Sequence, residues 1–370
     1  MAHSRGKIRD AIVDYLAACG AEVGLTEIED AVQRRLGNVP RSSVRSSLYH
    51  HADKIERIAR GQYRLRLVED DAVARVRLEP IVTVGQARLY HEDCFRWLSQ
   101  QDDDSIHAVV TDPPYGVVEY EENQLRKLRA GKGGVWRVPP SFDGHPRAPL
   151  PRFTTLRPED KVALTDFFRK LGAQLSRKVV PGGNVILASN PLLSHLIVSA
   201  LAEAGLEPRG YIARLVMTMR GGDRPKNAHE EFSEVSVLPR SQWEPWIVMR
   251  RQPEGRVQDN LRKWGTGGFR RISESRPFGD VMKSFPTPKR ERDIAPHPSL
   301  KPQEFLRKLV YASLPLGQGL ICDPFAGSGS TLAAANAVGY RSVGVESDAH
   351  FVRIAEQAIP SLGGLSIDPI

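Results

Sequence analysis

Two short segments of the sequence hold most of the residues that could do chemistry. Asp112-Pro113-Pro114-Tyr115 follows the apolar residues 106–110, and the glycine-rich residues 323–331 follow the apolar residues 319–322. Each pattern is typical of a buried strand that ends in a polar loop. Ligands of open α/β sheets bind at the carboxyl ends of strands, so two such loops can face one crevice.

The first segment has the groups needed to activate an exocyclic amine on a planar base. Such an amine is a poor nucleophile because its lone pair is delocalised into the ring. The carboxylate of Asp112 and the carbonyl of Pro113 can accept its hydrogen bonds, while Pro113 and Pro114 stiffen the loop. Tyr115 offers a ring for stacking, and a base within a duplex would have to flip out to reach it. The alternative interpretation is a plain β-turn.

The second segment suits a small cofactor. Gly327-Ser328-Gly329 lets the backbone approach a ligand closely, and N–H groups of the following helix point toward the same space. We expect Asp323 to meet a cationic amino group, and Glu346 at the next strand end to accept hydrogen bonds from ribose hydroxyls. A dinucleotide such as NAD is the rival ligand, although the loop lacks the third glycine of that fingerprint.

Together the two segments resemble the signature of S-adenosylmethionine-dependent DNA amino-methyltransferases, which methylate the N6 of adenine or the N4 of cytosine. Their order, with the Asp112 segment first, is similar to the circularly permuted β-class. Weaker matches are Glu92-Asp93-Cys94, the stretch from His297-Pro298 to Lys301-Pro302, and residues 343–348. The resemblance covers roughly residues 76–359.

The resemblance implies a catalytic group and a cofactor group of residues. The catalytic group is Asp112, Pro113, Pro114 and Tyr115. The residues expected to bind S-adenosylmethionine are Asp93, Cys94, Lys301, Asp323, Phe325, Ala326, Gly327, Ser328, Gly329, Ser330, Thr331, Glu346 and Ser347. In the family, Asp93 and Cys94 correspond to contacts with the adenine ring, and Lys301 lies in a segment near the methionine carboxylate. His297 is expected to cap or position rather than to act as a base.

The resemblance favours adenine N6 as the target, because DPPY is commoner in the adenine enzymes and SPPY in the cytosine-N4 enzymes. Cytosine N4 remains an alternative. Methylation of RNA or of a protein amide is less favoured, because those enzymes carry the glycine-rich loop before an NPPY-type motif. A non-enzymatic, DNA-binding regulator is the third hypothesis, and the intact Asp112, Asp323 and Glu346 weigh against it.

Composition agrees with a nucleic-acid partner without requiring one. The 370 residues carry a net charge of +8, which suits double-stranded DNA but also fits a merely basic protein. The three cysteines form no zinc pattern, and no apolar run is long enough for a membrane span. We therefore expect a cytoplasmic protein that binds no metal and no membrane.

The elements that must position these loops follow from strand–helix alternation, which predicts an α/β fold. The resemblance implies a Rossmann-like, circularly permuted class I methyltransferase sheet with helices on both faces, within residues 76–370. Helices are expected from 95 and at 161–180, 192–204, 302–314, 331–338 and 349–358, and strands at 88–90, 106–110, 184–188, 211–217, 244–249, 320–322 and 342–345. Residues 211–217 and 244–249 are expected to pair antiparallel, as in the family.

Residues 1–70 are predicted to form a separate, winged-helix-like domain. Helices at 4–20, 26–36 and from 40, the second opened by a capping box of Thr26 and Glu29, precede two strands at 55–59 and 63–67. The third helix would present Arg41, Arg45 and Ser46 to a DNA major groove. A protein–protein module of the same shape is the alternative.

Two basic stretches are candidates for DNA contact. Residues 116–160 form a long insertion beside the catalytic segment, with a solvated excursion as the alternative. Residues 250–297 correspond to the target-recognition region of the family, with a basic linker as the alternative. No nuclease or Walker motif is present in the sequence, so a restriction or defence partner would be a separate subunit, and β-class relatives are often homodimers.

Overall fold

The computed structural model describes residues 5–19, 23–50, 55–59, 61–65, 78–114, 136–137, 150–151, 158–220, 225, 228, 230–237, 239, 241–297 and 299–367. They belong to two compact units, Met1–Arg77 and Leu78–Ile370. The predicted boundary between residues 70 and 76 lies outside the described residues. So does most of the predicted insertion 116–160, apart from residues 158–160 and a two-stranded pair of β7 (Trp136–Arg137) and β8 (Leu150–Pro151).

The first unit combines three helices with a small antiparallel sheet. Its elements are α1 (Arg5–Cys19), β1 (Val23–Gly24), α2 (Leu25–Leu36), α3 (Arg41–His50), β2 (Ile55–Ala59) and β3 (Gln62–Leu65). The strand order is β1-β3-β2. Ile12, Ile28 and Val44, one from each helix, are fully buried in a core of their own. The three helices and the β2–β3 hairpin agree with those expected, whereas β1 was not predicted. The winged-helix assignment stays a proposal.

The predicted capping box at the start of α2 is wrong. The helix begins at Leu25, its N-cap is Gly24, and no side chain caps it. Glu29 is instead buried and accepts a hydrogen bond from Arg45 Nε at 2.7 Å, with Arg41 3.5 Å away. A buried carboxylate needs a charged partner, so Glu29 pairs with α3 rather than with its own helix end.

The second unit is built on a nine-stranded sheet in the order β12-β10-β11-β9-β6-β13-β14-β5-β4. Its strands are β4 (Val82–Val84), β5 (Ala87–His91), β6 (Ile106–Thr111), β9 (Val179–Ala188), β10 (Leu206–Arg220), β11 (Ser241–Arg251), β12 (Val281–Lys283), β13 (Leu320–Asp323) and β14 (Arg341–Glu346). The central strands β9, β6, β13, β14 and β5 are parallel. β11 runs antiparallel to both β9 and β10, as expected.

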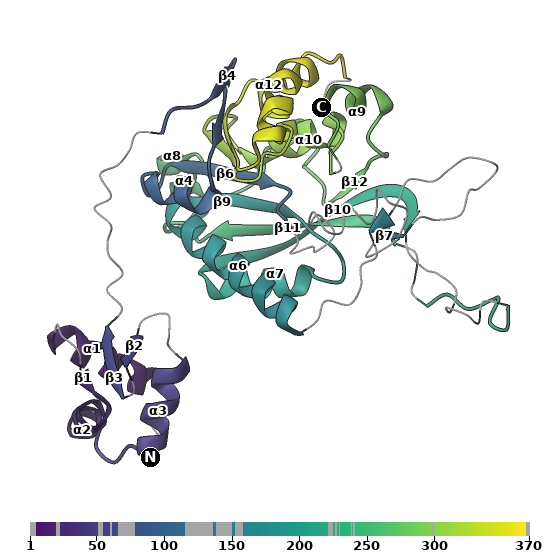
Figure 1. The fold of residues 1–370 in the computed structure, drawn as a ribbon. Helices are drawn as coiled ribbons and strands as arrows, with labels where there is room; N and C mark the ends of the chain where they lie inside the picture. The colour runs from purple at the N-terminus through teal and green to yellow at the C-terminus, as the bar shows by residue number, and fades with distance from the viewer. Residues whose placement is uncertain are drawn as a thin grey trace. The chain divides into compact units, whose positions relative to one another are not determined.

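Helices cover both faces of this sheet (Figure 1). The helices of this unit are α4 (Cys94–Gln100), α6 (Pro158–Lys178), α7 (Ser194–Glu203), α8 (Val257–Trp264), α9 (Lys289–Ile294), α10 (Gln303–Ser313), α11 (Ser330–Ala337) and α12 (Ala349–Gly363). Each face of the sheet has its own hydrophobic core, and adjacent residues of β6 belong to different cores. Val109 packs with α4, α6 and α7, whereas Val110 packs with α10 and α11. A strand buried on both sides explains the continuous apolar run in the sequence.

The structure differs from the predicted elements at several places: β4, β7 and β8 were not predicted, and β10 extends beyond the predicted 211–217. β9 begins at Val179, inside the predicted helix 161–180, because Pro181-Gly182-Gly183 lies in an irregularity of the strand rather than before it. The partners skip from Ile106↔Val179 to Ala108↔Asn184, and Gly182 has φ +76°. Residues 250–297 also contain more regular structure than expected, namely α8, β12 and α9.

Candidate active site

The two predicted loops follow neighbouring strands. β6 pairs with β13 and β13 pairs with β14, all in parallel, so their carboxyl ends lie at one edge of the sheet. Asp112 follows β6, Asp323 ends β13 and Glu346 ends β14. A 2.6 Å hydrogen bond from Thr111 Oγ1 to Asp323 Oδ1 joins the first two strand ends directly. The structure therefore brings the three predicted carboxylates to the same edge.

Asp112 is held by two donors from the segment that precedes α10. Lys301 Nζ lies 2.5 Å from Asp112 Oδ2, and Ser299 Oγ donates to the same oxygen at 2.6 Å. The side chain of Asp112 is 16% exposed. Pro113 is buried and Pro114 is exposed, whereas Tyr115 lies outside the described residues.

Lys301 contacts the predicted catalytic carboxylate, although the sequence grouped it with the cofactor residues. Its ammonium also lies 3.3 Å from Glu244 Oε1. Burial by itself lowers the pKa of Lys301, but the negative charges of Asp112 and Glu244 outweigh that effect and raise the pKa above its ordinary value. Lys301 is therefore a buried cation shared by two carboxylates.

Glu244 and Arg214 are site residues that the sequence interpretation missed. They face each other as partners in the β10–β11 register, and Arg214 Nη1 donates to Glu244 Oε2 at 2.7 Å. Arg214 also donates to Ser284 Oγ and to the carbonyl of Phe285, each at 3.1 Å. The available signal was one charged residue in each of the predicted strands 211–217 and 244–249, Arg214 and Glu244, because buried charges occur almost only in pairs.

Asp323 is a buried carboxylate with a strongly perturbed affinity for protons. Burial raises its pKa to about 6, against the lowering effect of hydrogen bonds from Thr111, Thr331 and the N–H of Phe325. The N–H of Phe325 lies 3.1 Å from Asp323 Oδ1. Because its ionised form lacks a cationic partner among these contacts, a bound cation would favour the charged carboxylate.

The glycine-rich loop needs glycine at two positions. Gly327 has φ +51° and Gly329 has φ +81°, both in the left-handed region. A Cβ on Gly329 would also lie 2.5 Å from Ile359 Cγ1. The N–H of Gly327 donates to Glu346 Oε2 at 2.8 Å, so the loop is tied to the next strand end. This contact keeps the backbone and the carboxylate in one unit.

Glu346 is also engaged on its other oxygen. The N–H of Asp348 donates to Glu346 Oε1 at 2.8 Å. Burial raises the pKa of Glu346, while these backbone hydrogen bonds lower it. Ser347, the next predicted residue, places its carbonyl 3.1 Å from His91 Nε2 at the end of β5.

Asp93 and Cys94 lie beside Glu346 across the neighbouring strand pair. The N–H of Glu92 donates to the carbonyl of Glu346 at 3.1 Å. The carboxylate of Asp93 caps α4, accepting from the N–H groups of Phe95 and Arg96. Cys94 is buried, and burial raises the pKa of its thiol to about 12, so it is neutral. These contacts give Asp93 a structural role at its side chain.

The remaining predicted cofactor residues lie in the glycine-rich loop and at the start of α11. Phe325 is half-buried and lies 5.9 Å from the ring of Phe167, while Ala326 donates its N–H to the carbonyl of Val345. Ser328 and Thr331 are buried. The carbonyl of Ser330 accepts a hydrogen bond from Gln303 Nε2 at 2.9 Å, which attaches the start of α11 to α10.

His297 packs against the glycine-rich loop. Its ring lies 4.4 Å from that of Phe351, and a Cβ on Gly327 would come within 3.1 Å of His297 Nε2. Burial lowers its pKa to about 4, so the ring is neutral at physiological pH. Its Nδ1 accepts the N–H of Ser299, the residue that donates to Asp112.

These residues fit S-adenosylmethionine. Two positive-φ glycines leave room where a Cβ would sit, and Asp323 and Glu346 are carboxylates suited to an ammonium group and to ribose hydroxyls.

Within the part of the chain that the structure describes, no cluster of three or more histidine, cysteine or acidic side chains could hold a metal. The same residues include no helix that is long and apolar enough to cross a membrane.

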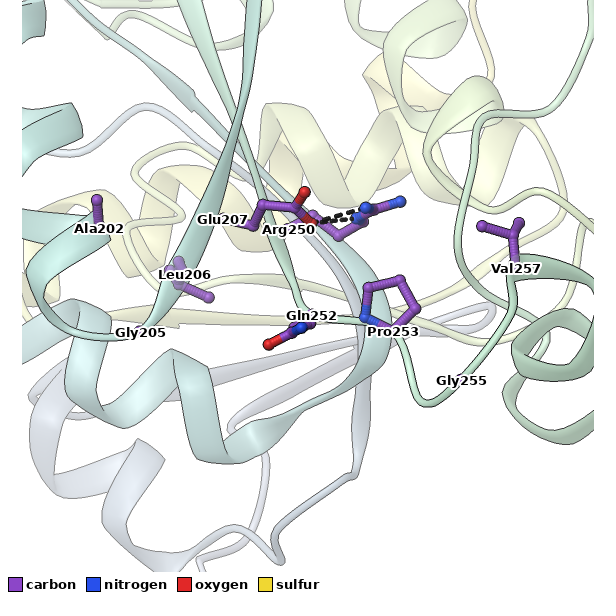
Figure 2. Close-up of a pocket in the computed structure, with 9 residues that line it drawn as sticks. All are labelled: Ala202, Gly205, Leu206, Glu207, Arg250, Gln252, Pro253, Gly255 and Val257. Carbon is purple, nitrogen blue, oxygen red and sulfur yellow. Dashed lines mark hydrogen bonds and ion pairs between the residues drawn. The ribbon is translucent and has the colours of Figure 1, made fainter.

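A cavity of 540 Å³ lies away from this site (Figure 2). It is bounded by Leu206 at the start of β10 and by Arg250 near the end of the antiparallel β11. Since β10 runs parallel to β6, this is the amino edge of the sheet, opposite the loops that carry Asp112 and Asp323. Its Glu207–Arg250 ion pair, with a 2.7 Å contact, is a structural feature of that edge.

The chain is similar in sequence to known DNA methyltransferases. The family model N6_N4_Mtase, described as DNA methylase, matches residues 106–357. Type II methyltransferase M2.DpnII of Streptococcus pneumoniae is 22% identical over 286 residues, covering 76% of this chain and 92% of that protein. M2.LlaDCHI of Lactococcus lactis subsp. cremoris is 29% identical with the same coverage. The solved PvuII DNA methyltransferase, cytosine-N4-specific, is 12% identical with a TM-score of 0.49, covering 78% of this chain and 90% of that one.

Proposed function

This chain belongs to the DNA methylase family, and we propose from that premise that it methylates the N6 of adenine in DNA at a defined sequence. The observation that carries the proposal is the Asp112 carboxylate directly after β6, beside the strand end that bears Asp323. A carboxylate there can accept a hydrogen bond from the exocyclic amine of a flipped base and orient its lone pair. Pro113 would offer its carbonyl and Tyr115 its ring to the same base.

S-adenosylmethionine would supply the electrophilic methyl group. Asp323 would meet its ammonium group and Glu346 its ribose, with Gly327 and Gly329 providing close backbone approach. Asp93 and Cys94, which are also predicted to contact it, follow β5, whose end lies next to Glu346. Direct attack of the amine on the methyl group needs no covalent enzyme nucleophile.

Adenine is favoured over cytosine by the aspartate at position 112, because the cytosine-N4 enzymes that the segment resembles more often carry serine there. The proposed partner is double-stranded DNA. Of the predicted target-recognition region 250–297, the part from β12 onward would contact it, because Arg250 and α8 lie at the opposite, amino edge of the sheet. We also propose that the chain forms a homodimer, that it works with a separate restriction or defence subunit, and that it is cytoplasmic. Their support is the likeness to type II methyltransferases.

The test is nucleoside analysis of DNA treated with the purified protein and S-adenosylmethionine. We expect mass spectrometry to detect N6-methyldeoxyadenosine, and single-molecule sequencing to place it in one motif. N4-methyldeoxycytidine in its place would contradict the choice of base. No methylated nucleoside on any DNA tested would contradict the proposed function.

The Asp112→Ala variant tests the mechanism. We expect it to reduce kcat by about 100-fold or more, because the positioned acceptor for the amine is lost. Asp103→Ala is a matched control, since Asp103 precedes the amino end of β6 and is 52% exposed in an ion pair with Lys178. Equal activity of the Asp112 variant and the control would overturn the role given to Asp112.

A further inference from the structure

We propose that Glu244, held by Arg214, is a positioning residue for the methyl transfer: it fixes Lys301 and shares its charge, so that Asp112 stays an effective acceptor. The inference rests on the proposed function of Asp112. Glu244 lies on β11 and Arg214 on β10, strands that neither sequence motif includes. The chain of alternating charges is Asp112, Lys301, Glu244 and Arg214.

Distances show that Lys301 is shared between its two carboxylates. Its ammonium lies 2.5 Å from Asp112 Oδ2 and 3.3 Å from Glu244 Oε1. The side chain of Lys301 is 10% exposed, and both carboxylate side chains are 16% exposed. In such surroundings water screens little of the attraction, so each charge strongly affects the next.

Arg214 fixes the far end of this chain. It is 6% exposed, and three of its nitrogens donate to separate oxygens of Glu244, Ser284 and Phe285. Its guanidinium also lies 5.1 Å from the ring centre of Phe305 on α10. Trp246 Nε1 lies 3.4 Å from the same Glu244 oxygen that Arg214 contacts. Glu244 is thus held in one orientation before any substrate binds.

The charge of Glu244 changes what Asp112 can do. With Glu244 ionised, the ammonium of Lys301 is divided between two anions, and Asp112 keeps part of its capacity to accept from an amine. With a neutral residue at position 244, the ammonium of Lys301 would pair with only one carboxylate, that of Asp112. A carboxylate fully engaged by a buried cation is a weaker acceptor for the substrate, so the rate of methyl transfer should fall.

The experiment compares Glu244→Gln and Glu244→Asp with the wild-type full-length chain. We expect Glu244→Gln to reduce kcat about 10- to 50-fold, while the KM for DNA and for S-adenosylmethionine changes less than about 3-fold. Glu244→Asp keeps the charge and should recover at least about a third of the wild-type kcat. Thermal unfolding of each variant identifies any loss of fold.

Glu207→Gln is a matched control from the same pair of strands. Glu207 and Arg250 are also an Arg–Glu pair in direct β10–β11 register, at the amino edge of the sheet (Figure 2). Removing the charge of Glu207 perturbs the strands without touching Asp112 or Lys301. We expect wild-type kcat from this variant.

A double-mutant cycle with Lys301→Met tests whether Glu244 acts through Lys301. In that background Glu244→Gln should change kcat less than about 2-fold, because no shared cation remains. A wild-type kcat for Glu244→Gln, an equal loss in both backgrounds, or the same loss for Glu207→Gln would overturn this inference. Absence of methylation by the wild-type chain would instead refute the proposed function, which keeps the two failures distinct.

Discussion

Three carboxylates at one sheet edge have three different environments. Asp112 is bonded to a buried lysine, Glu346 to backbone N–H groups, and Asp323 to hydroxyl groups and one N–H. Burial acts on Asp323 without a compensating cation among these contacts, which is why its pKa rises to about 6. Residue type alone therefore does not set the charge at a strand end.

Asp323 should make stability depend on pH between about 4 and 6. Its pKa is about 6 in the folded chain and 3.8 as its ordinary value, so the folded state binds the proton more tightly. The stability that this group contributes is complete below about pH 4 and is lost as pH rises through 6, by about 3 kcal/mol. Asp323→Asn should remove this dependence.

Urea unfolding of cofactor-free protein at several pH values measures this effect. Between pH 4 and pH 7, the free energy of unfolding of the Asn variant should rise by about 3 kcal/mol relative to that of the wild type. Other titrating groups are common to both proteins and cancel in the difference. If the two proteins differ in free energy of unfolding by the same amount at every pH, Asp323 is not the source of the pH dependence.

At the scale of elements, buried polar side chains attach the connecting segments to the sheet. Asn260 on α8 is 1% exposed, and its Nδ2 donates to the carbonyls of Pro181 in β9 and of Thr266. Its Oδ1 accepts the N–H of Glu254. This side chain holds the irregular segment Pro181-Gly182-Gly183 of β9 in place. The sequence predicted this segment as the end of a helix rather than as part of the strand.

Asn260→Ala should lower the free energy of unfolding by about 2–4 kcal/mol, because several buried polar groups lose their partners. The control is Asp259→Ala at the adjacent position, where the side chain is 56% exposed and forms an ion pair with Arg262. We expect less than about 0.5 kcal/mol from it. Denaturant unfolding provides both values, and equal effects would contradict the role of Asn260.

At the scale of the whole molecule, the chain consists of two units with separate cores. The first unit exposes Arg41 and Arg45 on α3, with side chains 54% and 60% accessible, and buried Glu29 orients both. Arginines fixed in this way suit contacts with DNA phosphates. We propose that the first unit adds affinity for DNA and leaves the chemistry to the second.

Deletion of residues 1–77 should therefore raise the KM for DNA about tenfold and leave kcat unchanged, with a weaker dependence of binding on salt. Steady-state kinetics at two salt concentrations measure both effects. Arg41→Ala combined with Arg45→Ala in the full chain should reproduce part of the increase. An unchanged KM would favour the alternative, a unit that binds another protein.

The amino-acid sequence was sufficient to identify the strands that carry chemistry and the loops that follow them, in their order along the chain. Apolar runs predicted β6, β13 and β14 because strands covered on both faces consist mostly of apolar residues. Gly327 and Gly329 were identifiable because their backbone conformations exclude most side chains. These are local properties, which neighbouring residues fix along the chain.

The tertiary structure alone decided which charges meet. Lys301 was assigned to the cofactor from its position in a motif, yet it contacts Asp112 and Glu244, residues that lie 189 and 57 positions away in the sequence. Glu29 likewise binds an arginine of the next helix rather than capping its own. Ion pairs depend on distances across strands and helices, which the sheet order sets and periodicity along one segment does not contain.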